Sequence, residues 1–80
     1  MQIVYKLYGG NRSGALIELN ENIYRTDDGY VRIRDYLYMR GVKYMLEYFV
    51  YEADLNNSRR LAENEFRNYL SSVFSKDYIF

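Results

Sequence analysis

The sequence predicts a small α+β domain: an antiparallel β-meander of about four strands in two hairpins, with one C-terminal helix packed on the sheet. Two observations predict this fold class. Apolar residues alternate with polar ones over the first two thirds of the chain, whereas they recur at helical spacing over the last third. Turn signals rich in glycine and asparagine divide the first part. Eighty residues with 49% hydrophobic content can build one thin core, so we expect a single domain over residues 1–80.

The first two strands are expected at residues 2–8 and 15–19, where side chains alternate with a period of two. The glycine-rich segment 9–14 between them is typical of a hairpin loop. Residues 20–29 contain two turn signals, around a short apolar segment at 23–25 that could form one more strand.

Residues 30–39 and 42–52 are predicted to form the second hairpin, with Arg40 and Gly41 as its two-residue turn. This register places Arg34 opposite Glu47, an attractive pair of charges, and it leaves an almost wholly apolar opposite face. Asp35 is the misfit on that apolar face, and it predicts a bulge or a bend.

Two other interpretations of this segment stay open. A continuous helix would place Gly41 in its interior, at a cost of about 1 kcal/mol. A short helix at 35–40, ended by Gly41 and followed by a strand, is the third interpretation. The continuous helix rests on five apolar residues at helical spacing: Tyr38, Val42, Met45, Leu46 and Phe49.

The C-terminal helix is predicted over about residues 57–75. An apolar stripe recurs at helical spacing, and polar side chains occupy the opposite face; the stripe consists of Ala62, Phe66, Tyr69, Leu70 and Val73, widened by Leu61 and Phe74. We expect Phe66, Leu70 and Val73 to be largely buried against the sheet.

Catalysis is not expected from this composition. The chain contains no cysteine and no histidine, which removes disulfides, thiolate metal sites and the commonest general base. Gly9 and Gly14 have the spacing of a phosphate-binding loop, but alanine and leucine follow where lysine and serine or threonine are required. Asp27 and Asp28 lack the remaining ligands of a calcium loop. We expect no catalytic residues, no cofactor and no metal site.

The formal net charge is zero, with 11 basic and 11 acidic residues. This balance argues against a protein that mainly binds polyanions non-specifically. The charges are nevertheless uneven, since residues 32–43 carry a basic excess and residues 47–65 an acidic one. No apolar run approaches the length of a membrane span, and the first residues lack the pattern of a signal peptide. We therefore expect a cytoplasmic protein without a membrane partner.

Tyrosine is unusually frequent, at 11 of 80 residues. Tyrosine and arginine are enriched in binding hot spots, so their coincidence on one strand predicts a partner-binding face. The alternative is that the tyrosines cover a small core. The predicted partner-binding residues are Tyr30, Arg32, Arg34, Tyr36, Tyr38 and Arg40.

In length and composition the chain resembles the small accessory proteins of phages and other mobile elements, including anti-CRISPR inhibitors. That resemblance implies a non-catalytic protein that inhibits a host complex by occupying one of its surfaces. Two alternatives remain. The same tyrosine–arginine face could bind nucleic acid, as in a small regulator. It could also be buried in a homodimer of a self-assembling structural protein.

Overall fold

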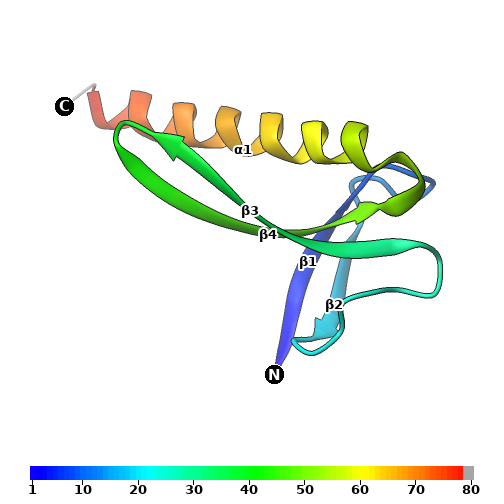
Figure 1. The fold of residues 1–80 in the computed structure, drawn as a ribbon. Helices are drawn as coiled ribbons and strands as arrows, with labels where there is room; N and C mark the ends of the chain where they lie inside the picture. Colours follow the sequence, from blue (N-terminus) through cyan, green and yellow to red (C-terminus); the bar gives the residue numbers. More distant parts are fainter. Residues whose placement is uncertain (79–80) are drawn as a thin grey trace.

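A four-stranded mixed sheet carries one long C-terminal helix on one of its faces, in an α+β arrangement that confirms the predicted fold class (Figure 1). The computed structural model describes the backbone of residues 1–78 and the side chains of residues 1–73. Its elements are β1 (Gln2–Tyr8), β2 (Leu16–Asn20), β3 (Tyr30–Met39), β4 (Val42–Tyr51), a single 3-10 turn (Glu52–Asp54) and α1 (Leu55–Tyr78).

The strand order is β2-β1-β4-β3, which differs in one respect from a meander. β1 lies beside β4 and runs parallel to it, with Leu7 opposite Phe49 and Tyr8 opposite Val50. A meander, in which each strand pairs with the next strand along the chain, follows from the general tendency of consecutive strands to be neighbours. Burial explains the observed order, because Leu7, Phe49 and Val50 are fully buried only as members of the two central strands. Figure 1 shows the two hairpins crossing at a steep angle.

The second hairpin has the predicted register, from Tyr30 opposite Tyr51 to Met39 opposite Val42. Both helical interpretations of this segment are therefore wrong. Of the bulge or bend expected at Asp35, the bulge is wrong, because Asp35 pairs with Leu46 in an unbroken ladder. Its carboxylate is instead satisfied by Arg59 of α1, 2.8 Å away.

The turn between β3 and β4 has φ 53° at Arg40 and φ 76° at Gly41. Positive φ at both central residues is typical of the two-residue turns that match the twist of a hairpin. Gly41→Val is expected to destabilise the protein by about 2 kcal/mol, because a β-branched side chain is strained in the left-handed region. A Cβ at Gly41 would meet nothing within 4 Å, so the cost is one of backbone conformation.

Thermal melts followed by circular dichroism measure this loss. Arg40→Asn is the matched control, and it should raise the melting temperature because asparagine tolerates this conformation. A more stable Gly41→Val variant would contradict the assigned turn.

Two apolar clusters lie on opposite faces of the sheet. On the face that α1 covers, Leu37, Leu46, Tyr48 and Val50 pack with Ala62 and Leu70. On the other face, Tyr5, Leu7, Tyr30 and Phe49 form a second cluster, against which the β1–β2 hairpin folds. The helix is longer than the predicted 57–75, and of the three residues expected to be largely buried only Leu70 is fully so. Phe66 and Val73 are half-buried. Tyr69 and Leu61 of the predicted stripe are exposed, because the helix contacts the sheet over a narrower face than the stripe predicts, and the side chain of Phe74 lies outside the described residues.

The predicted short strand at 23–25 is reduced to one isolated bridge between Arg25 and Val31. Backbone hydrogen bonds hold this segment beside β3, since Arg32 N donates to Tyr24 O at 2.9 Å and Thr26 N to Tyr30 O at 2.9 Å. This segment therefore covers only the first residues of the outer edge of β3.

Candidate protein-binding surface

The halves of β3 and β4 nearer to their turn form a two-stranded ribbon, residues 33–48, that we call the arm. β4 pairs with β1 only at Phe49 and Val50, so the arm extends beyond the rest of the sheet. α1 runs along one side of the arm, and the opposite side faces away from the helix (Figure 1).

Side chains alternate between the two sides of a strand, so even-numbered residues of β3 and odd-numbered residues of β4 point away from α1. Tyr36, Tyr38 and Met45 are all large, and they are 47%, 65% and 56% exposed. Tyr36 lies opposite Met45 and Tyr38 opposite Lys43 in the register. We call this surface the arm face; its residues are Arg34, Tyr36, Tyr38, Lys43, Met45 and Glu47.

The charges of the arm face are largely matched within the protein. Arg34 donates from Nε and Nη2 to Oε1 of Glu47, at 3.0 and 2.8 Å. This hydrogen bond to Glu47 raises the pKa of Arg34 above its usual value. The Lys43 ammonium lies 4.2 Å from the centre of the Tyr36 ring, a cation–π contact. The arm face therefore exposes two tyrosines and a methionine beside largely matched charges, and it carries a small positive excess.

Two of the six predicted binding residues are internal instead. Tyr30 is buried, and its hydroxyl donates to Gly9 O at 2.6 Å and accepts from Arg12 N at 3.0 Å. It fixes the 9–14 loop and is not available to a partner. The reason is the β1–β2 hairpin, which packs over this end of the same sheet face.

Arg32 is half-buried and also makes internal contacts. It donates to Tyr5 Oη at 3.0 Å and to Glu21 O at 2.8 Å. Its guanidinium lies 3.9 Å from the centre of the Tyr24 ring. Arg32 therefore joins β3 to β1 and to the segment after β2, and its donors are directed inward.

The other four predicted residues remain together near the surface. Arg34, Tyr36 and Tyr38 belong to the arm face, and Arg40 is exposed in the turn beside it. Met45 is the main residue that the sequence reasoning missed. Its position opposite Tyr36 in the predicted register was a signal that could have identified it.

Asp35 lies on the α1 side of the arm and connects the arm to the helix. Arg59 Nη2 donates to Asp35 Oδ2 at 2.8 Å, and the backbone N of Tyr36 donates to Asp35 Oδ1 at 2.8 Å. These contacts, the first above all, hold the pKa of Asp35 below its usual value. Asp35 thus fixes α1 over β3 and also occupies one donor on the outer edge of β3.

Asp35→Asn should lower stability at neutral pH and make it less sensitive to acid. A carboxyl group with a lowered folded-state pKa stabilises the protein above its unfolded pKa, about 3.9 for aspartate, and that stability is lost as the pH falls through the folded value. The gap between wild type and variant should therefore close below about pH 4. Urea melts between pH 3 and pH 7 measure it, and a gap independent of pH would contradict the assigned ion pair.

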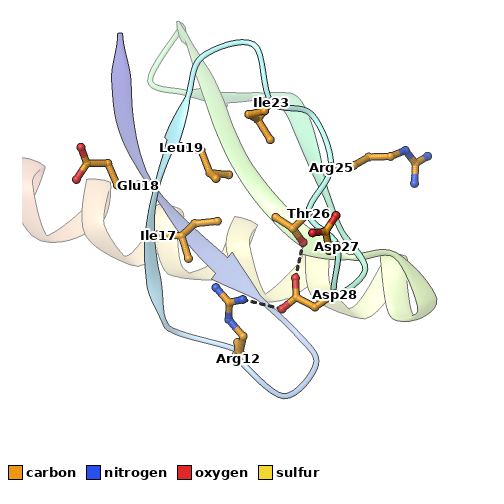
Figure 2. A pocket seen from close by; sticks show the side chains of 9 residues that line it. All are labelled: Arg12, Ile17, Glu18, Leu19, Ile23, Arg25, Thr26, Asp27 and Asp28. Carbon is orange, nitrogen blue, oxygen red and sulfur yellow. Dashed lines mark hydrogen bonds and ion pairs between the residues drawn. The ribbon is translucent and has the colours of Figure 1, made fainter.

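An open groove of about 720 Å³ lies between β2 and the segment before β3, at the end of the molecule away from the arm (Figure 2). The Arg12 guanidinium is bound to Asp28 at 2.7 Å, and Thr26 Oγ1 donates to the other Asp28 oxygen at 2.6 Å. Figure 2 shows Arg25 pointing out of the groove, where it pairs with Glu52. The charged residues that line this groove therefore mainly connect neighbouring loops to one another.

Within the described part of the chain, no group of three or more histidine, cysteine, aspartate or glutamate residues is placed to hold a metal ion. No described helix is long and apolar enough to cross a membrane. Comparison with protein-family models, with curated proteins and with solved structures finds no match for this chain.

Proposed function

We propose that this chain is a non-catalytic protein-binding module that engages its partner through the arm face. The observation that carries the proposal is the coincidence of Tyr36, Tyr38 and Met45 on one exposed surface of a regular hairpin. Aromatic residues and methionine are enriched in protein interfaces, and tyrosine supplies a large contact area at a small cost in side-chain entropy. The hairpin ladder fixes their backbone before a partner binds, which lowers the ordering cost of binding.

The charges of the arm face favour a protein over a nucleic acid. Binding to phosphates depends on lysine and arginine side chains that are free to replace counterions. Arg32 is directed inward, and Arg34 is already bound to Glu47. Arg34 and Lys43 against Glu47 leave one net positive charge on the face. This is enough to orient a protein partner with an acidic patch, but it is little for a polyanion.

A module of this size acts by occlusion. Its described residues include no metal-holding group, and several pocket-lining charges form ion pairs, such as Arg12 with Asp28 and Lys6 with Glu65, so its effect follows from covering a surface of a larger assembly. The host complex implied by the resemblance to phage accessory proteins is such an assembly. The homodimer remains the alternative if the arm face instead contacts a second copy.

The test is affinity capture with quantitative mass spectrometry, in which the bait is the wild type, Tyr38→Ala or Tyr24→Ala. Tyr24 is the matched control, because it is 63% exposed and lies off the arm face. A protein captured through the arm face should bind Tyr38→Ala about 30-fold more weakly, the equivalent of about 2 kcal/mol. It should bind Tyr24→Ala almost as well as the wild type.

Two results would overturn the proposal. Equal capture by Tyr38→Ala and wild type would place the interface elsewhere. Tight binding of a fluorescent oligonucleotide that weakens steeply with salt would indicate phosphate recognition instead.

A further inference from the structure

The edge of β4 that faces β1 is open along the arm. Glu52 N, just after β4, donates to Gly29 O, just before β3. Even-numbered residues of β4 therefore direct their backbone N–H and C=O groups toward β3. Odd-numbered residues of β4 therefore direct theirs toward the opposite edge. β1 pairs with that edge only from Phe49 onward. Within residues 1–78, no strand pairs with this edge at Lys43, Met45 and Glu47.

A pocket of about 280 Å³, with Leu46, Ala62 and Phe66 in its lining, lies directly beside this open edge, under α1. Phe66 of α1 forms one side and is only half-buried, although the helical pattern predicts it to be covered. The pocket is smaller than the roughly 300–1,000 Å³ typical of sites for small molecules, so it suits one large side chain. Its lining is Tyr8, Met45, Leu46, Glu47, Tyr48, Ala62 and Phe66.

We propose that this edge is a second binding site, which takes a short extended segment of another protein as an added strand. Peptide donors and acceptors that alternate along a strand edge are satisfied together only by another extended backbone. On the α1 side, one apolar side chain of the added segment enters the pocket beside Leu46. The site differs from the arm face in its chemistry, because it recognises main chain and an apolar anchor on the α1 side, although its edge residues Lys43, Met45 and Glu47 also belong to the arm face.

A charge preference follows from Lys43. Its ammonium contacts the Tyr36 ring and has no ion-pair partner among the described residues. In the added segment, the anchor residue lies opposite Leu46, on the α1 side. The residue three positions from the anchor lies opposite Lys43 and points to the other side of the sheet, as Lys43 does. An acidic side chain at that position would pair with Lys43 across the strands.

A second copy of this chain fits the edge less well than a short segment does. If β4 paired antiparallel with β4 of a second copy, opposite charges would face each other only in the register that places Lys43 opposite Glu47 of the copy. That register places the copy's Gly41 beside Phe49, where β1 already pairs. A short segment can end before Phe49 and avoid this collision.

The experiment selects phage-displayed random heptapeptides on the intact chain. The expected consensus has one large apolar residue and an acidic residue three positions from it. A synthetic consensus peptide should shift the amide resonances of Lys43, Met45 and Glu47. Met45→Pro removes one outward N–H from the edge, where proline is tolerated, and it should weaken peptide binding about tenfold or more.

Glu18→Pro is the matched control, because it places proline on the outer edge of β2 and should leave peptide binding unchanged. Tyr38→Ala should also leave it unchanged, which separates this site from the arm face. Should Met45→Pro fail to fold, Phe66→Ala provides a second variant. By enlarging the pocket, it should shift the selected anchor toward aromatic residues.

Three results would overturn the proposal: no enriched peptide, amide shifts confined to other elements, or equal binding by Met45→Pro. A dimer that light scattering detects in the wild type and that Met45→Pro dissociates would also overturn it, because a second copy would then occupy the edge.

Discussion

Gly9→Ala is expected to destabilise the protein by about 3 kcal/mol or more. A Cβ at Gly9 would lie 1.9 Å from Ser58 Oγ and 3.0 Å from Ser58 Cβ, at a φ of 81°. The left-handed backbone costs about 1–2 kcal/mol for alanine, and overpacking adds about 1–3 kcal/mol. A domain of this length has a total stability of about 4–12 kcal/mol, so the variant should be close to unfolding at 37 °C.

Gly14→Ala separates the two contributions. Gly14 has a φ of 90°, but a Cβ there would meet nothing within 4 Å, so this variant carries the backbone strain alone. Urea melts should show a loss of about 1–2 kcal/mol for Gly14→Ala and a clearly larger loss for Gly9→Ala. Equal losses would mean that α1 does not approach the end of β1 as closely as the structure places it.

The close contact at Gly9 also explains an unusual feature of α1. Ser58 is completely buried, and its hydroxyl has no hydrogen-bond partner among the described residues. An unsatisfied buried hydroxyl lowers stability. Serine is nevertheless nearly as small as alanine, and a larger side chain at position 58 would collide with the backbone at Gly9. The backbone just after β1 and the first turns of α1 therefore approach each other closely, with a glycine on one side and a small serine on the other.

How far the sequence predicts this structure depends on the range of the interactions involved. The β3–β4 register was predictable because the Arg40–Gly41 turn and the Arg34–Glu47 pair are local to the hairpin. The parallel pairing of β1 with β4 was not, because it joins residues about forty positions apart, Leu7 and Phe49 among them. No local pattern records such a contact, and only burial of the two central strands favours it.

The candidate binding residues show the same limit. Tyr30 and Tyr38 belong to one strand face and look equivalent in the sequence, yet Tyr30 is 2% exposed and Tyr38 is 65% exposed. The difference arises because the β1–β2 hairpin covers the first half of that face and leaves the arm uncovered. Asp35 looked like a misfit for a similar reason, since its partner Arg59 lies on a helix 24 residues away.

Because the β1–β2 hairpin covers Phe49 but not Met45, the second large loss of stability is expected for substitution of Phe49 and not of Met45. Both residues point away from α1 on β4, but Phe49 is fully buried with its ring 5.0 Å from that of Tyr5, whereas Met45 is 56% exposed. Phe49→Ala should therefore cost about 3–5 kcal/mol, through lost burial and the cavity that remains. For a domain of this size the melting temperature should fall by more than about 12 °C.

Met45→Ala, four residues earlier on the same face, should change stability by less than about 0.5 kcal/mol, as surface substitutions usually do. The contrast tests whether the arm face is free for a partner, because a side chain packed within the protein cannot be removed without a stability cost. Thermal melts of the two variants in parallel measure it. A loss at Met45 comparable to that at Phe49 would show that the arm face belongs to the core, and the proposed binding surface would then have to lie elsewhere on the molecule.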